Sequence, residues 1–146
     1  MSLGDLLGDS DKSKLFKMSL NPGDVFLKEF EGIDHKKFFI VAGISQDRIF
    51  LCSIYINSRI HPSVMQRQHL LELQIPLKKQ NNPFLKYDSF ANCSTPIPME
   101  SESLSVWISD ESCKVIGSIH KPDLKFIIES LKNSGLLSEE EMELYF

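Results

Sequence analysis

A chain of 146 residues with 42% hydrophobic and 25% charged residues has the size and composition of one globular domain with a real core. Its formal net charge of −4 argues against a protein that coats nucleic acid without specificity, although a local basic surface is compatible with an acidic body. No apolar run approaches the ~20 residues that cross a membrane. The first 19 residues are too polar for a signal peptide, so we predict a cytoplasmic protein without a membrane segment.

Residues 1–20 are small, acidic and turn-forming, and they predict a mobile N-terminal arm or a short helix that frays. Residues 21–146 then form the single domain. Between Gly23 and Asn57, three apolar runs separated by two short polar segments predict a three-stranded meander, with residues 31–35 closing the first hairpin around Gly32. Residues 38–42 and 49–52 are apolar on both faces, so we expect two central strands that are covered on two sides.

The middle of the chain predicts shorter strands. Residues 57–63 are polar and predict a flexible loop. Residues 68–75 alternate like a strand with one wet face, and residues 84–93 predict another strand whose exit is marked by Pro96 and Pro98. Residues 99–110 predict a short extended segment, because Leu104, Val106 and Ile108 alternate, and residues 112–119 predict the last strand.

Two helices are expected at the C-terminal end. The first begins near Pro122 and carries an apolar stripe at 3–4 spacing, with Gly135 placed to end it. Ser138 and Glu141 have the spacing of a capping box for the second. The fold class predicted from this order is mainly β: a small, strongly bent antiparallel barrel or sandwich with one or two C-terminal helices.

The cysteines predict no special chemistry. Cys52, Cys93 and Cys113 are far apart in the sequence and lie in apolar surroundings, which is typical of reduced, buried thiols. A zinc site would need closely spaced cysteines with histidines at ligand spacing, and the sequence has none. We therefore predict no disulfide, no metal and no cofactor.

The best site candidate from pattern is a cationic cluster, His35, Lys36 and Lys37, at the entrance of the second strand. Loops on a rigid sheet are common places for binding groups, although such a tip can also be simply solvated. Trp107 and Tyr87 interrupt polar stretches and are candidates for stacking on nucleic-acid bases.

Four segments carry a family resemblance. They are G-D-V-F at residues 23–26, a basic-then-aliphatic strand at 37–44, D-S-F-A-N-C-S-T-P at 88–96, and K-V-I-G-S-I-x-K-x-D-L at 114–124. In this order they resemble the MazF/PemK toxin family over residues 21–134. The resemblance implies an SH3-like barrel of the kind shared with the CcdB toxins.

The resemblance also implies a function. Members of that family are dimeric, metal-independent endoribonucleases that inhibit growth and are neutralised by an antitoxin protein. By resemblance, RNA, an antitoxin and a second copy of the chain are the expected partners. We assigned the dimer contact to apolar residues beyond the needs of one core: Ile54, Ile56, Leu136, Leu137 and Met142.

The resemblance places the site residues. At the position of Lys37 the family has an arginine; lysine keeps the positive charge but lacks the planar guanidinium that binds a phosphate through two hydrogen bonds. At the positions of Asn92 and Ser94, PemK-type members have an arginine and an aspartate. His35 is the titratable group available as a general base. The catalytic candidates are His35, Lys37 and Ser94, and the substrate-binding candidates are Lys36, Tyr55, Arg59, His61 and Asn92.

Two functions remain open from the sequence. One is a toxin-like RNA-binding protein or endoribonuclease with altered catalytic residues. The other is a catalytically inactive barrel that acts as a protein-binding module. The distinguishing observation is whether His35, Lys37, Tyr55, Asn92 and Ser94 converge in one cleft.

Overall fold

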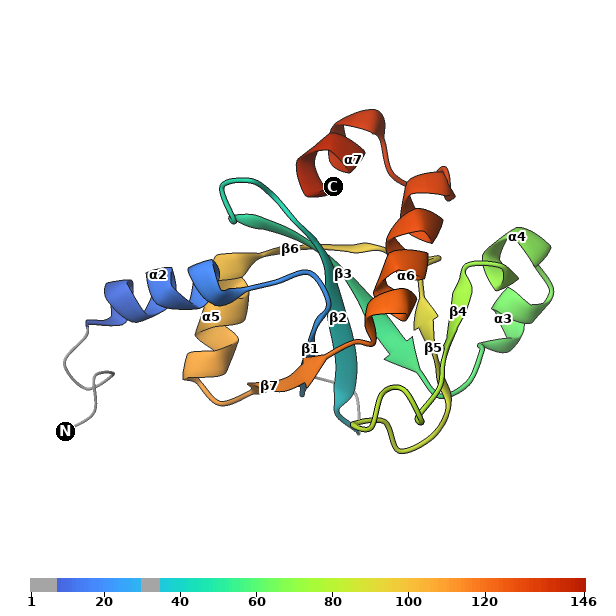
Figure 1. Ribbon diagram of the computed structural model, residues 1–146, viewed down its shortest axis with the longest axis horizontal. Coiled ribbons are helices and arrows are strands. Elements are labelled where there is room, and N and C mark those ends of the chain that lie inside the picture. The colour runs from blue at the N-terminus through green and yellow to red at the C-terminus, as the bar shows by residue number, and fades with distance from the viewer. Residues whose placement is uncertain (1–7, 30–34) are drawn as a thin grey trace.

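The computed structural model describes residues 8–29 and 35–146 (Figure 1). Its strands are β1 (Asp24–Lys28), β2 (Lys37–Ile44), β3 (Phe50–Asn57), β4 (Gln74–Leu77), β5 (Ser89–Asn92), β6 (Ile97–Glu100) and β7 (Cys113–Ser118). Its helices are α2 (Asp9–Ser19), α3 (Pro62–Met65), α4 (Gln68–Leu71), α5 (Ser101–Ser109), α6 (Lys121–Asn133) and α7 (Glu139–Tyr145). Within the described ranges, none of these helices is both long and apolar enough to cross a membrane.

The seven strands form one antiparallel sheet, which confirms the predicted architecture at this level. Their order is β4-β5-β3-β2-β1-β7, and β6 also pairs with β3. Strand β3 is shared between two neighbours, because residues 50–53 pair with β6 and residues 56–57 pair with β5. Over the described strands the sheet stays open, with β4 and β7 at its two ends.

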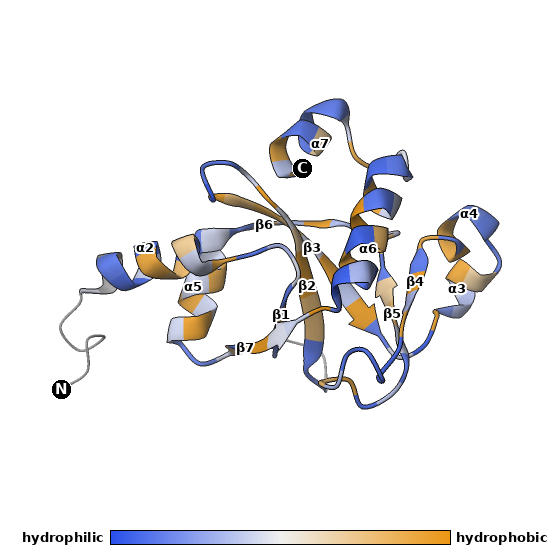
Figure 2. Ribbon diagram, in the orientation of Figure 1, coloured by the Kyte–Doolittle hydropathy of each residue, from blue (hydrophilic) through white to orange (hydrophobic). Residues whose placement is uncertain are grey.

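Both central strands are buried on two faces, as their apolar sequences predicted. In β2, Ile40 belongs to one hydrophobic cluster, whereas Phe39 and Val41 belong to another. All three are fully buried. Figure 2 shows the apolar character of these two strands at the centre of the molecule. The sheet therefore separates two cores rather than enclosing one.

Helices cover both faces of the sheet. Helices α6 and α7 contribute Ile127, Leu131 and Tyr145 to the first core, and α2 and α5 contribute Phe16 and Leu104 to the second. The two pairs lie on separate sides of the sheet (Figure 1). The sequence predicts only one or two C-terminal helices, so the cover supplied by α2 and α5 is a finding of the structure.

The extended segment predicted for residues 99–110 was wrong. The chain is extended only through β6 and then forms helix α5. The alternation of Leu104, Val106 and Ile108 was misleading, because Val106 is 52% exposed. The positions that pack on the core are Leu104, Trp107 and Ile108, at helical spacing.

The strands predicted at residues 68–75 and 84–93 were too long. Residues 68–71 are helix α4, and β4 begins only at Gln74 and runs through the exposed Pro76. Pro76 is tolerated because β4 is an edge strand. Strand β5 starts only at Ser89. The preceding residues 84–87 form turns and bends, and Phe84 and Leu85 pack against the first core instead of extending the strand.

Two predictions fall partly or wholly outside the described residues. The hairpin tip at residues 31–34, including Gly32, lies outside them, as do residues 1–7 of the N-terminal arm. Residues 9–19 are helical, and Phe16 and Leu20 pack on the second core. Arg48 fixes this segment, since its guanidinium donates to the carbonyl oxygens of Lys17 and Leu20.

The C-terminal helices have the ends that their sequences predicted. Gly135 follows α6 with φ of 75°, a conformation that favours glycine. The capping box of α7 is present, with Ser138 Oγ accepting from the Glu141 N–H and Glu141 accepting from the Ser138 N–H. At Gly43, a Cβ atom would lie 2.8 Å from the Cβ of Tyr145, so glycine lets α7 lie directly against β2.

Replacing Leu131 by alanine should lower the free energy of unfolding by about 2–4 kcal/mol. The side chain is fully buried in the core between α6 and the sheet, and the change leaves a cavity there. Denaturant unfolding measures the loss. The matched control is Phe126→Ala on the same helix, since Phe126 is 60% exposed and its loss should cost less than about 0.5 kcal/mol. Equal costs for the two variants would mean that α6 is not docked as described.

Candidate functional site

A cleft of about 720 Å³ opens at the end of the sheet where β2 begins and β3 ends. Its lining comes from three segments, residues 35–38, 56–59 and 85–87, together with Leu27 and Ser89. The first two segments meet because β2 and β3 are antiparallel and pair Phe39 with Tyr55, which brings the start of one beside the end of the other. The predicted candidates His35, Lys36, Lys37 and Arg59 all line this cleft.

The charged side chains in the described lining of the cleft are all basic. Lys36, Lys37, Arg59 and Lys86 line it together with His35, and the described lining contains no aspartate or glutamate. Glu29 lies near its rim, where one carboxylate oxygen is 3.5 Å from Lys36 Nζ. A protein with a net charge of −4 thus presents a local surface that suits an anion.

Lys37 is held in place rather than free in solvent. Its Nζ donates to Asn57 Oδ1 at 2.7 Å and lies 5.8 Å from the centre of the Tyr55 ring. Neither contact neutralises the charge, because an amide oxygen and an aromatic face carry only partial charge. Burial raises the pKa of Tyr55, so its hydroxyl stays protonated near neutral pH.

A second lysine lies directly beside Lys37 on the sheet. Lys28 of β1 is its cross-strand partner and is only 8% exposed. Lys28 Nζ donates to the carbonyl oxygen of Glu29 and lies 4.8 Å from the centre of the Trp107 ring. Two like charges facing each other across strands are unfavourable by themselves, so the ring and the carbonyl offset part of that cost.

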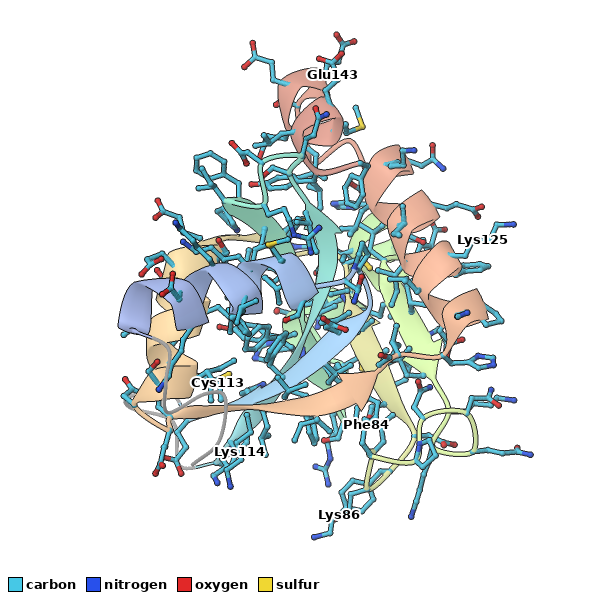
Figure 3. All side chains as sticks on the ribbon, turned by 60° about the vertical axis from the view of Figure 1, so that its left-hand side comes forward. Phe84, Lys86, Cys113, Lys114, Lys125 and Glu143 are labelled. Atoms are coloured by element: carbon cyan, nitrogen blue, oxygen red, sulfur yellow. The ribbon has the colours of Figure 1, made fainter. Side chains whose placement is uncertain are left out.

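The third wall of the cleft is a loop anchored by its apolar residues. Leu85 is 3% exposed in the first core, and Phe84 packs edge-on against Phe38 with ring centres 5.4 Å apart. This docking places Lys86 and Tyr87 at the mouth of the cleft, and Figure 3 shows Lys86 reaching away from the body of the protein near Phe84. Tyr87 is 61% exposed, which leaves its ring available for stacking.

Three other candidates lie outside the cleft lining. Asn92 Oδ1 accepts from the Nε2 of Gln74 at 2.8 Å and from the hydroxyl of Ser94. Ser94 Oγ also accepts from Gln74 Nε2 at 3.1 Å, so these side chains bond to one another. His61 caps the short helix α3, where its Nδ1 accepts from the N–H of Ser63. The five residues meant to distinguish the two functions therefore do not converge in one cleft.

Tyr55 lies between two surfaces. It lines a separate groove rather than the cleft, although its ring faces Lys37. Sequence reasoning missed Asn57 and Lys86 as members of the site. The signal for Lys86 was the apolar pair Phe84 and Leu85 within a polar stretch, which is typical of an anchored loop.

In the described part of the chain, the cysteine, histidine and acidic side chains form no metal-binding group. No three His, Cys, Asp or Glu side chains there gather into a group able to hold a metal ion. The cysteines are buried and unpaired with one another. Burial raises the pKa of Cys52 and of Cys93 to about 12, and that of Cys113 to about 11.

No family model matches this chain, and no curated protein matches it at a significant level. The likeness to the MazF/PemK family therefore rests on the sequence motifs alone.

Native protein should react very slowly with a thiol reagent such as DTNB at pH 8. With pKa values of about 11 to 12, roughly one thiol in a thousand or fewer is ionised at that pH. Absorbance of the released thiolate measures the reaction, and the control is the same protein in denaturant, where all three thiols should react at once. A native thiol that reacts within seconds would contradict the buried environments described.

Proposed function

We propose that this protein is a toxin-like RNA-binding protein of the MazF/PemK type that acts as a metal-independent endoribonuclease. The observation that carries the proposal is the cleft itself, where His35, Lys37 and Arg59 from two neighbouring strand ends line one basic surface. The ligand is a single-stranded RNA segment, whose backbone supplies the anions and whose bases supply the stacking surfaces.

The cations bind the phosphodiester backbone. Lys37 contacts a phosphate from a fixed position, because Asn57 already holds its ammonium group. Arg59 and Lys86 are on flanking segments and contact neighbouring phosphates. Tyr87, exposed at the mouth, stacks on an unpaired base.

His35 and Lys37 carry the chemistry. His35 accepts the proton of a ribose 2′-hydroxyl, and the 2′-oxygen forms a bond to the adjacent phosphorus. The bond from phosphorus to the 5′-oxygen of the next nucleotide breaks, and that oxygen receives, through a water molecule, the proton that His35 accepted, which restores the neutral imidazole. Lys37 stabilises the charge that develops on the phosphorane oxygens. The products are a 2′,3′-cyclic phosphate and a 5′-hydroxyl, so no oxidant or metal enters the balance.

Asn92 and Ser94, which lie outside the cleft lining, take no part in the chemical step of this proposal. Both are engaged with Gln74 next to the end of β5, so the step is assigned without a carboxylate at the position of Ser94. A serine hydroxyl is a poor proton acceptor near neutral pH, and the proton transfer rests on His35.

The finer architecture and the assembly belong to the same proposal. Sharing of β3 between β5 and β6 supports a strongly bent, SH3-like sheet. We propose a homodimer and an antitoxin partner on the same resemblance. Ile54, Ile56 and Leu137 are buried in the chain's own core, so of the five residues predicted for the dimer contact only Leu136 and Met142 remain accessible to a second copy.

Replacing Lys37 by alanine should weaken RNA binding and lower the slope of log K against log salt by about one unit, because one phosphate contact is lost. His35→Ala should instead leave affinity within a few fold and reduce the cleavage rate by ~10²-fold or more. Salt-dependent binding and cleavage of single-stranded RNA measure the two effects. The matched control is Lys125→Ala, which removes a lysine of α6 outside the cleft (Figure 3).

The outcome decides between the two functions left open by the sequence. Cleavage that survives His35→Ala would move the catalytic role to another residue. If the unmodified protein neither cleaves RNA nor binds it in a salt-dependent way, the endoribonuclease proposal fails and the protein-binding module is preferred.

Analytical ultracentrifugation should show a dimer at tens of micromolar, about twice the chain mass of 16.7 kDa. An isologous interface of ordinary size holds two copies together at that concentration. Leu136→Glu places a charge on a side chain that is 44% exposed and should shift the equilibrium toward monomer. A single species at the monomer mass for the unmodified protein would contradict the dimer.

A further inference from the structure

Residues 78–88 connect β4 to β5 and contain no helix or strand of their own. We call them the cleft loop, because their last part forms the third wall of the basic cleft. This part carries Lys86 and Tyr87, two exposed side chains that contact RNA in the proposed function. A segment without regular backbone pairing needs other contacts to stay in one place. The position of Lys86 and Tyr87 therefore depends on what holds the cleft loop.

Asn82 is a polar side chain of the cleft loop with no exposed surface. Its Nδ2 donates to the carbonyl oxygen of Lys78 at 3.1 Å and to Asp123 Oδ2 at 3.0 Å. Its Oδ1 accepts from the backbone N–H of His120 at 2.9 Å. Both amide hydrogens and the amide oxygen thus have partners. Two of these partners, His120 and Asp123, belong to the start of α6, so the side chain joins the loop to that helix.

The backbone of Asn82 carries the same restraint toward the cleft. Its carbonyl oxygen accepts from the N–H of Leu85 at 2.9 Å, and Leu85 directly precedes Lys86. At the base of the loop, the N–H of Lys79 donates to Asp88 Oδ1 at 2.9 Å. The loop is thus closed at its base and held at Asn82, and a displacement of Asn82 would displace Leu85 and Lys86 with it.

Apolar packing alone does not select one position for the loop. Phe84 and Leu85 attach it to the first core, but hydrophobic contact has no directional preference. Hydrogen bonds are directional, and a buried amide that loses its partners is costly. A shifted loop would leave Asn82 in that state. The Asn82 contacts therefore hold the loop in one of the positions that apolar packing permits.

We propose that Asn82 is the positioning residue of the RNA site, and that its bond to Asp123 holds the cleft loop against α6 so that Lys86 and Tyr87 line the cleft. The ligand in this inference rests on the proposed function, whereas the restraint on the loop is independent of it. Asn82 itself contacts no substrate. The cleft then has two parts: the residues at the start of β2 perform the chemical step, and the cleft loop contributes affinity.

Trypsin tests the restraint without RNA, because it cuts after Lys86 when the loop opens. Asn82→Ala removes three side-chain hydrogen bonds, so cleavage after Lys86 should become about tenfold faster or more. Mass spectrometry of the fragments measures the rate. The matched control is Leu104→Ala, which weakens the second core and should leave this local cleavage unchanged. Equal rates for Asn82→Ala and the unmodified protein would overturn the proposal.

An exchange of the two side chains separates the restraint from a general loss of stability. Asn82→Asp places a second carboxylate beside Asp123 and should speed cleavage after Lys86, because like charges repel. Adding Asp123→Asn restores an amide–carboxylate pair with donor and acceptor exchanged. The double variant should recover at least half of the change on a logarithmic scale, since the bond to Lys78 is not restored. A double variant that is cut as fast as Asn82→Asp alone would overturn the role of Asp123.

RNA gives a readout that a merely structural role would not change. In Asn82→Ala, affinity should fall and the slope of log K against log salt should fall by about one unit, because Lys86 no longer contacts a phosphate. The cleavage rate at saturating RNA should stay within about threefold, and Leu104→Ala should keep the slope. An unchanged slope in Asn82→Ala would overturn the positioning role. If the unmodified protein does not bind RNA, the proposed function fails, and trypsin still decides whether Asn82 holds the loop.

Discussion

The rest of the structure depends on the pairing of β2 with β3, two strands that are apolar on both faces. A strand pair of this kind has no side that water can cover, so the chain has to supply a layer above and a layer below it. Helices α6 and α7 form one layer, and α2 and α5 form the other. Helices from both ends of the sequence therefore pack against the central strands. Gly43 lets α7 lie directly against β2, because a larger residue there would contact Tyr145.

The same pairing creates the basic cleft. Antiparallel register brings Lys37 at the start of β2 beside Asn57 at the end of β3, and β1 adds Lys28 in the same row. Lys37 keeps its positive charge there, because the Asn57 amide oxygen and the Tyr55 ring that hold it carry only partial charges. Bringing like charges together is unfavourable, but the free energy gained by packing the sheet is far larger than any single charge interaction and offsets it.

Strand β3 also contributes to two surface hollows of different chemistry. Its last residues line the basic cleft, and its first residues line the aromatic groove beside β6. Tyr55 lies between them, with one contact to Lys37 and a place in the groove wall.

The sequence by itself determined the two central strands, the late helix with Gly135 after it, and the capping box of α7, because each depends on local patterns of polarity and turn chemistry. It also grouped His35, Lys36 and Lys37 at the entrance of the second strand, because they are consecutive in the chain. Only the tertiary structure decided that Asn57 and Lys86 join that cleft while Asn92 and Ser94 bond to Gln74 instead. The register of β5 and the docking of Phe84 and Leu85 set those positions, and both depend on side-chain packing between distant segments. The same holds for α5, whose helical face is defined by the core it covers and not by the alternation of its own residues.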